Sequence, residues 1–332
     1  MEIEIRGYRI CTHDDVSDQP GLLKALADLN ALTFAEYDGV VVPSQEFMSW
    51  YTQRPGMDPR LCQAAFAGER LVASVFVTLA EMRLRDQSVQ CAIIDTLMTH
   101  PGHRRKGLAR ALLQRAMTAM ERADADVSLL NTAQADPPAG PQQLYESLGY
   151  RPVELVDRWV SRTAGSSGEH ALDSVGVGED VRRGLQARLG QRDGWLALDQ
   201  DLWLWRRAER PSAYPVEVVR TSQDVVAAVC TGPLLSRGEE QPFAVLSDFA
   251  PSEEADYEGA VRELLSAVPA NATATMLCGR SDEKLAGALQ VAGFERAGTE
   301  IAMLRAVMPE AEAWIEPPMN QWYVAVESVI GV

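Results

Sequence analysis

Apolar residues in the first half of the chain recur at two spacings, and the spacing separates predicted strands from predicted helices. A run of leucines at helical spacing predicts a helix over residues 20–32. Residues 33–51 carry aromatic and acidic side chains with neither period, so the pattern assigns them no element. Alternating or continuous apolar runs predict strands at 3–12, 61–68, 70–80, 82–85, 91–99, 127–131 and 151–162.

The segment 91–113 joins a strand to a helix through a basic turn. The strand ends at Pro101 and Gly102, and a helix is predicted over 104–122. The unpaired N–H groups of a first helical turn favour an anion, and Gly107 lets the backbone approach it closely. The turn therefore predicts a ligand that carries phosphate. Four cations surround it in a chain of net charge −16: Arg104, Arg105, Lys106 and Arg110.

The second half repeats the strand–helix order of the first. Gly293-Phe294 ends its last helix, as Gly149-Tyr150 ends the helix predicted over 141–148. The chain has 332 residues and a linker of small residues near 165, so we predict two domains, 1–164 and 165–332. The alternation of strands and helices predicts an α/β or α+β fold. The repeated elements are strands at 243–249 and 273–277 and helices at 253–268 and 283–292.

The two halves differ at the basic turn. When the repeats are aligned, residues 103–107 correspond to 255–259, where Asp256 and Glu258 are acidic and Gly259 is the one shared residue. Carboxylates repel a phosphate group at any dielectric constant that a protein offers. The second half is therefore predicted to be a degenerate copy that does not bind the anion.

Composition narrows the classes of function. With 47 acidic against 31 basic residues, the chain is a poor match for nucleic acid and suits a cationic small molecule better. No apolar run approaches the roughly 18 residues that span a membrane, so no membrane partner is expected. The five cysteines are scattered and form no Cys/His cluster, so we expect no metal and reduced thiols in the cytoplasm.

Two short motifs follow the predicted strand 91–99. The first is Thr99-x-Pro101-x-x-Arg104-x-x-Gly107-x-Ala109, and the second is LYESLGY at 144–150. Together they resemble the signatures V-x-P-x-x-[RQ]-x-x-G-x-[GA] and L-Y-x-x-x-G-[FY] of GCN5-related N-acetyltransferases (GNAT enzymes), with Thr99 in place of the usual valine. The resemblance covers about residues 5–163. It implies the GNAT acyl-CoA N-acyltransferase fold, a mixed twisted sheet flanked by helices, here in two tandem copies.

The resemblance implies acetyl-CoA as the cosubstrate. In the family, the strand before the basic turn diverges from its neighbour, and its free backbone groups pair with pantetheine; here those residues are Leu97, Met98 and Thr99. Asn131, at the end of the next strand, matches a position that often serves pantetheine, while the capping of a turn explains it equally well. The pyrophosphate would lie on the turn formed by Arg104, Arg105, Lys106, Gly107, Leu108, Ala109 and Arg110.

Acetyl transfer to an amine needs a base for the amine and an acid for the departing thiolate. Tyr145 matches the general acid of the family, and a phenol with an ordinary pKa of about 10 keeps its proton at neutral pH. Asp95 is the one acid on the strand 91–99 and is a candidate base, with a hydrogen-bonded structural role as the alternative. In the family, the region 33–51 roofs the acceptor site; a packed helix-loop-helix is the other interpretation.

These observations predict an N-acetyltransferase that acts on an amine of a small molecule. The second half is expected to be structural or to form a wall of the acceptor pocket. The alternative is a catalytically silent acyl-CoA-binding or sensor protein, and the sequence leaves a homodimer open. The tail contains strand-like residues 322–329. They are expected either to close the acceptor site at the seam between the domains or to belong to the second domain.

Overall fold

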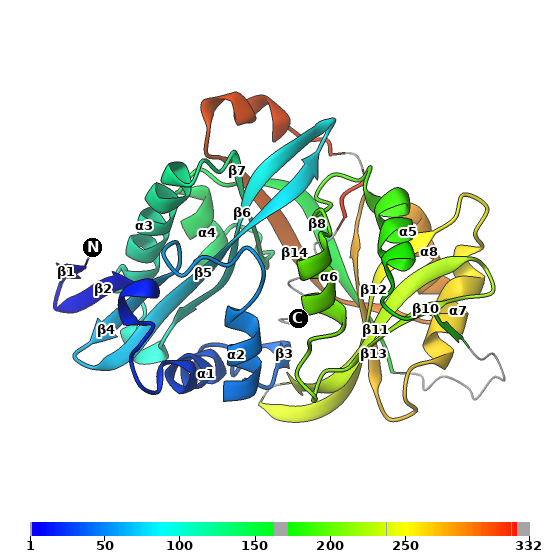
Figure 1. Ribbon diagram of the computed structural model, residues 1–332, viewed down its shortest axis with the longest axis horizontal. Coiled ribbons are helices and arrows are strands. Elements are labelled where there is room, and N and C mark those ends of the chain that lie inside the picture. The colour runs from blue at the N-terminus through cyan, green and yellow to red at the C-terminus, as the bar shows by residue number, and fades with distance from the viewer. Residues whose placement is uncertain (1, 163–171, 237, 320, 324–332) are drawn as a thin grey trace.

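The computed structural model describes residues 2–162, 172–236, 238–319 and 321–323 (Figure 1). The strands of both halves join in one 14-stranded sheet. Those of the first half are β1 (Ile3–Ile5), β2 (Tyr8–Thr12), β3 (Asp38–Val41), β4 (Gln63–Ala67), β5 (Arg70–Leu84), β6 (Gln87–Thr99), β7 (Val127–Ala133) and β8 (Arg151–Ser161). Those of the second half are β9 (Asp173–Ser174), β10 (Val216–Arg220), β11 (Val225–Ser236), β12 (Glu239–Pro251), β13 (Thr273–Gly279) and β14 (Glu295–Ala306).

The α-helices are α1 (Leu22–Thr33), α2 (Gln45–Thr52), α3 (Leu108–Arg122), α4 (Gly140–Glu146), α5 (Glu179–Leu189), α6 (Gln200–Arg207), α7 (Tyr257–Ser266) and α8 (Glu283–Val291). The α-helices α1, α3, α4, α7 and α8 correspond to the helices that the apolar spacing predicts, whereas α2, α5 and α6 were not predicted. Short 3₁₀ segments lie at Asp14–Val16, Pro101–His103 and Pro309–Trp314. No helix in the described ranges is long and apolar enough to cross a membrane.

Some predicted strand boundaries in the first half are wrong. The single strand predicted over 3–12 is the hairpin β1–β2, because two residues between the strands have positive φ angles and reverse the chain. The strands predicted at 70–80 and 82–85 are one strand, β5. Glu81 of β5 pairs with Gln90 of β6, so the ladder continues through the polar position that interrupts the apolar pattern.

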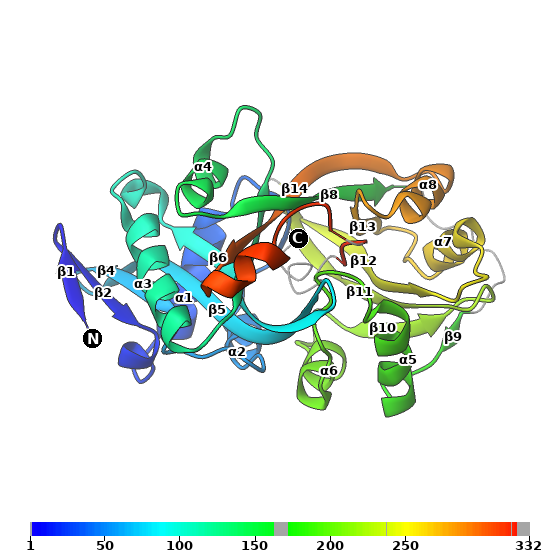
Figure 2. The same ribbon diagram turned by 90° about the horizontal axis from the view of Figure 1, so that it is seen from above.

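The two halves exchange their last strands. β14 of the second half lies between β7 and β8, and β8 of the first half lies between β14 and β13. Figure 2 shows β8 and β14 side by side where the halves meet. In the described part of the chain, both sheet partners of β8 therefore come from the other half. The linker predicted near residue 165 lies outside the described residues.

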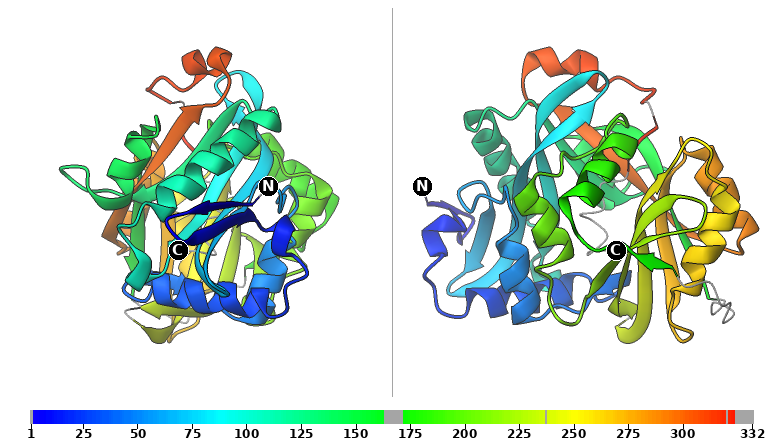
Figure 3. Two further views of the ribbon diagram at one scale, coloured as in Figure 1. Left: turned by 90° about the vertical axis from the view of Figure 1, so that its left-hand side faces the viewer. Right: turned by 45° about the vertical axis from the view of Figure 1, so that its right-hand side comes forward.

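Helices cover both faces of the sheet (Figure 3). α3 and α4 pack on the first half, and α7 and α8 pack on the second, each pair with its own apolar core. On the opposite face, α1 and α2 of the first half share one core with α5 and α6 of the second. Three tryptophans of the second half are at most 4% exposed and lie in this shared core: Trp195, Trp203 and Trp205.

A pair of stacked tryptophans fastens the halves together. The rings of Trp50 on α2 and Trp205 on α6 lie 4.2 Å apart between centroids, with 3° between their planes. Each indole N–H donates to the other residue's carbonyl oxygen, at 3.4 Å from Trp50 and 3.0 Å from Trp205. β3 also pairs with β11 across the halves. Region 33–51 is thus an ordered strand and helix held against the second half.

We expect Trp205→Ala to lower the free energy of unfolding by about 3–5 kcal/mol, because it removes a buried ring that stacks on Trp50 and the hydrogen bond from its indole to the Trp50 carbonyl. Chemical denaturation with fluorescence or circular dichroism would measure the loss. Leu32→Ala, at a side chain that is 45% exposed on α1, is the matched control and should change stability by at most about 0.5 kcal/mol. A similar small change for Trp205→Ala would show that the stack does not join the halves.

Candidate active site

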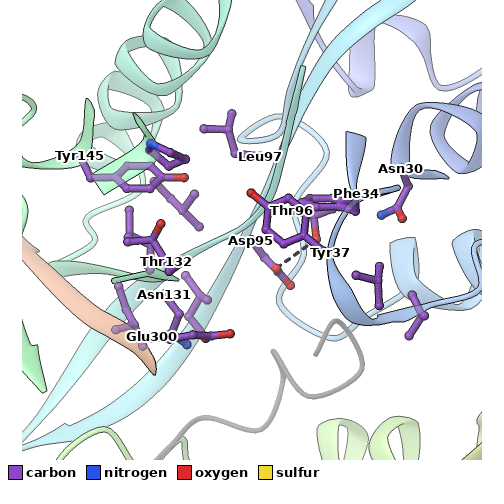
Figure 4. A pocket seen from close by; sticks show the side chains of 18 of the residues that line it. Asn30, Phe34, Tyr37, Asp95, Thr96, Leu97, Asn131, Thr132, Tyr145 and Glu300 are labelled. Atoms are coloured by element: carbon purple, nitrogen blue, oxygen red, sulfur yellow. Dashed lines mark hydrogen bonds between the residues drawn. The ribbon is translucent and has the colours of Figure 1, made fainter. Parts of the chain in front are cut away.

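A cavity lies where β6 and β7 move apart. The two strands pair in parallel only from Cys91 to Ile93 on β6, opposite 127–129 on β7. Beyond that point they diverge, as the family resemblance implies, and a cavity of about 420 Å³ occupies the gap. Its walls come from α1, α2, β3, β6, β7, α4, β8 and β14, so both halves of the chain build it (Figure 4).

A β-bulge in β6 shapes one wall of this cavity. Phe76 of β5 pairs with Asp95 and Ser74 pairs with Met98, so two residues of β6 stand opposite one of β5. The bulged residue Thr96 has a φ angle of 48°, which a β-branched residue rarely adopts. The bulge turns successive residues to the same side, and Asp95, Thr96 and Leu97 all line the cavity.

The basic turn follows β6 and leads into α3. Arg105 and Gly107 have φ angles of 63° and 85°, a left-handed conformation that suits the glycine. Gly107 is the N-cap of α3 and has no side chain to cap it, so the first N–H groups of the helix are open to a ligand. An added Cβ at Gly107 would meet no atom within 4 Å, so the approach to this turn is unobstructed.

The cationic side chains of the turn also hold it to its surroundings. Arg104 donates to the carbonyl oxygens of Thr33 at 3.0 Å and Thr99 at 3.3 Å. Lys106 Nζ lies 3.0 Å from the hydroxyl of Tyr8, and Arg110 donates to Ser147 Oγ at 2.7 Å. Arg105 is exposed. These contacts hold the turn in place, and its cations surround the start of α3 with positive charge.

Four of the predicted site residues meet in the cavity, and two neighbours on β6 do not line it. The Met98 side chain is fully buried in the core shared by α1, α2, α5 and α6, and the Thr99 carbonyl accepts from Arg104. The residues of the turn, 104–110, lie beyond the end of β6 and do not line the cavity either. The four predicted residues that the structure brings together are Asp95, Leu97, Asn131 and Tyr145.

Tyr145 lies on α4 and projects its hydroxyl into the cavity, toward Leu97 (Figure 4). Its side chain is 7% exposed, and its ring packs edge-on against Tyr150 with 6.1 Å between centroids. No residue in the described ranges hydrogen-bonds its hydroxyl. Burial raises the pKa of the Tyr145 phenol above its usual range, so the group is protonated at neutral pH. The geometry offers this proton to a ligand.

Asp95 is bound by residues that the sequence analysis did not identify. Its carboxylate accepts hydrogen bonds from the hydroxyls of Tyr51 and, at 3.0 Å, Thr96, and it pairs with Arg54 at 3.8 Å. The Arg54 side chain is only 1% exposed. Burial first, and then the charge of Asp95, raise the pKa of Tyr51, which keeps its proton for this bond. The sequence carries no signal for this cluster, because Tyr51 and Arg54 are distant from Asp95 along the chain.

The second half supplies a further carboxylate, Glu300 on β14. Glu300 lines the cavity together with Gly298 and Thr299 of β14 and Arg158 of β8 (Figure 4). Burial raises the pKa of the Glu300 carboxyl, and the charge of Arg158 partly opposes the shift. Sequence analysis missed this residue because β14 reaches the first half's cavity only through the exchange of strands.

The corresponding place in the second half is filled. β12 has the same bulge, with Asp248 at a φ angle of 52°, and pairs with β13 only as far as Leu246. Here Trp322 and Tyr323 of the tail occupy the gap, and about 40 Å³ is left. At the start of α7, the Asp256 side chain accepts from the N–H of Glu258 at 3.1 Å, so a carboxylate stands where a phosphate would.

The described part of the tail packs at the seam between the halves. The hydroxyl of Tyr323 donates to Asp248, and its N–H donates to the carbonyl of Asp193 at 2.7 Å. Trp322 lies in a core that contains residues of β6, β7 and β14. Neither residue belongs to a strand, and the rest of the predicted strand 322–329 lies outside the described residues. Neither lines the large cavity, so these two residues take no direct part in it.

Comparison with known proteins agrees with this geometry. The model of a GNAT acetyltransferase domain matches residues 23–153. No curated protein matches the chain in a sequence comparison. Among solved structures, a GCN5-related N-acetyltransferase from Anabaena variabilis ATCC 29413 superposes with a TM-score of 0.60 at 14% identity, covering 91% of this chain and 73% of its own.

Two further structures are also similar across both halves. An N-myristoyltransferase of Saccharomyces cerevisiae with bound myristoyl-CoA has a TM-score of 0.69 at 12% identity and covers 92% of this chain and 80% of its own. A protein of Enterococcus faecalis V583, described as a probable N-acyltransferase, has a TM-score of 0.57 at 13% identity and covers 90% and 73%. Residues 23–153 therefore match the model of a GNAT acetyltransferase domain, and the two halves together have the GNAT acyltransferase fold.

Proposed function

We propose that this protein transfers acetyl from acetyl-CoA to an amine of a small molecule by direct attack. The observation that carries the proposal is the position of Tyr145. Its buried, protonated hydroxyl enters the cavity beside Leu97, at the place where β6 and β7 diverge, and has no partner among the described residues. That is the position from which an acid can protonate a thiolate leaving from the gap.

The residues present suit a CoA thioester. The diverged backbone at Leu97, Met98 and Thr99 would pair with pantetheine, and the Asn131 side chain would face it from β7. The open N–H groups that follow Gly107 would hold the pyrophosphate at the start of α3. The N-myristoyltransferase structures that share the fold contain an acyl-CoA, which supports this class of cosubstrate.

The opposite wall of the cavity suits an amine acceptor. Phe34, Tyr37 and Phe47 line it, and so does the Asp95 side chain. Aromatic faces and a carboxylate both attract an ammonium group. The bonds from Tyr51 and Arg54 fix the orientation of Asp95, so we propose that it binds the incoming cation; its role as base stays a prediction.

An amine-dependent release of thiol from acetyl-CoA tests this proposal. The purified protein should release free CoA with some members of a panel of small aromatic and aliphatic amines, and mass spectrometry should find the acetylated product. Propionyl-CoA and myristoyl-CoA, tested in parallel, would define the acyl group. Tight binding of acetyl-CoA without product for any amine would favour the silent acyl-CoA-binding alternative instead.

We also expect one acyl-CoA site per chain, in the first half. Calorimetric titration with acetyl-CoA should give a stoichiometry of one, because the matching gap of the second half is filled by Trp322 and Tyr323. Gly107→Glu should abolish binding, since it places a negative charge and a side chain at the turn. Gly107→Asn is the matched control: asparagine tolerates a positive φ angle and adds no charge, so it should lose much less affinity.

Two independent sites would contradict this assignment, and so would unchanged binding in Gly107→Glu. Gly107 is a cleaner target than Arg104, whose side chain also supports the carbonyls of Thr33 and Thr99. A loss in Arg104→Glu could therefore reflect a displaced turn rather than a lost phosphate contact.

A further inference from the structure

The exchanged strand β14 brings Glu300 into a cavity that otherwise belongs to the first half. Glu300 stands opposite Ala133 of β7 on one side and Val156 of β8 on the other. Its side chain points into the cavity near Asn131, while Asp95 enters from β6 and Tyr145 from α4 (Figure 4). Three ionisable groups on three elements, from both halves of the chain, thus face one volume.

The surroundings of the two carboxylates differ. Asp95 accepts two side-chain hydrogen bonds and has an ion pair with the buried Arg54. The Glu300 side chain accepts no hydrogen bond from any residue in the described ranges. A carboxylate that is already bonded and paired is a weak proton acceptor, whereas one without such bonds can receive a proton from a ligand.

The charged and titratable groups that face Glu300 also favour it over Asp95 as the proton acceptor. The charge of Arg158 on β8 acts on Glu300, and Tyr37, Tyr51, Tyr145 and Asp95 are the other titratable groups that line the cavity. Burial outweighs Arg158 and raises the pKa of Glu300. A carboxyl whose pKa moves up toward neutrality is a better match for a general base at neutral pH.

We propose that Glu300 is the general base that deprotonates the acceptor amine. The inference rests on the proposed acetyl transfer. It means that the second half, which does not use its own cleft, supplies a catalytic residue to the first. The acceptor is then an amine that is an ammonium ion at neutral pH, because only such an amine needs a base before it can attack.

The protons balance in this scheme. The Glu300 carboxylate takes one proton from the ammonium group, and the free amine nitrogen forms a bond to the thioester carbonyl carbon. The carbon–sulfur bond breaks, and the sulfur takes the proton of Tyr145. The nitrogen loses its second proton, which restores the Tyr145 phenol, and Glu300 releases its proton to solvent. The products are an amide, a thiol and one proton.

Glu300→Gln tests the proposal through the pH dependence of kcat/KM with the best amine of the panel. The variant should lose about a hundred- to ten-thousand-fold at neutral pH. Its rate should then rise steadily with pH as the amine loses its proton in solution, so the loss shrinks at alkaline pH. Acetyl-CoA affinity and thermal stability should stay close to those of the wild type, because the side chain keeps its shape.

Three controls distinguish a role of Glu300 as the general base from other effects of its substitution. Glu295→Gln removes the same charge from an exposed position of β14 and should leave the rate unchanged. Asp95→Asn should keep the acid limb of the profile even if its KM for the amine rises. Formate should restore part of the rate of Glu300→Ala, since it replaces the missing carboxylate.

Two results would overturn the assignment: an acid limb in Glu300→Gln with the same midpoint as in the wild type, or the loss of that wild-type limb in Asp95→Asn. Wild-type turnover is the reference for each of these variants. A failure of the proposed acetyl transfer would therefore appear in the wild type, whereas a failure of the base assignment would appear only in the variants.

Discussion

Tyr145→Phe is expected to lower kcat by about a hundred- to ten-thousand-fold and to leave the affinity for acetyl-CoA unchanged. The substitution removes one oxygen and its proton, while the ring still packs against Tyr150 at the cavity wall. Without the proton, sulfur must depart as a thiolate, which is a poorer leaving group than a thiol. Single-turnover kinetics and calorimetry would measure the two quantities separately.

The pH profile gives a second test of the same role. Burial raises the pKa of Tyr145, so the phenol keeps its proton to a higher pH than an ordinary tyrosine. The wild-type rate should therefore not fall on the alkaline side up to pH of about 10, the usual pKa of a phenol. A decline that begins near neutral pH and vanishes in Tyr145→Phe would mean that the acid ionises where the structure says it should not.

Tyr150→Phe is the matched control. The Tyr150 hydroxyl lies 2.8 Å from Ser128 Oγ, outside the cavity, and its ring is buried beside that of Tyr145. Its loss should lower the free energy of unfolding by about 1 kcal/mol and leave kcat near the wild-type value. Full activity of Tyr145→Phe, or equal losses in both variants, would exclude Tyr145 as the acid.

The fragment 1–164, the predicted first domain, is expected not to fold by itself. It contains β7 and β8 but lacks β14, which separates them, and β13, which pairs with the far edge of β8. In the full chain, seven residues of β14 pair with β7 along the full length of that strand. Without these partners, β8 would have no neighbour in the sheet, and the edge of β7 would be exposed.

Coexpression tests this expectation. The fragment alone should aggregate or lack cooperative unfolding, whereas coexpression with 165–332 should yield a soluble complex that binds acetyl-CoA. The full chain is the control for both measurements. A monomeric 1–164 with cooperative thermal unfolding and a well-dispersed NMR spectrum would show that the first half rearranges its strands and does not depend on β14.

Residues near one another along the chain determined much of what the sequence could predict. The basic turn and Gly107 are one continuous segment at the start of a helix, and the anion site follows from the geometry of that segment. The family motif around Tyr145 is continuous as well, and the structure places that side chain in the cavity. The acidic residues at 256–258 likewise distinguish the second half from the first, since a helix start depends on few neighbours.

Only the tertiary structure decided which strands lie together. The alternation of apolar residues in β14 is the same whether its neighbour belongs to its own half or to the other, because the period reports burial and carries no information about the partner. Glu300 therefore gave no signal in sequence, and neither did the pairing of Asp95 with Tyr51 and Arg54. The filled cleft of the second half is likewise invisible in sequence, since Tyr323 reaches Asp248 from 75 residues away. The turn and the motif are local and could be predicted; the second carboxylate of the cavity arises from long-range strand pairing and could not.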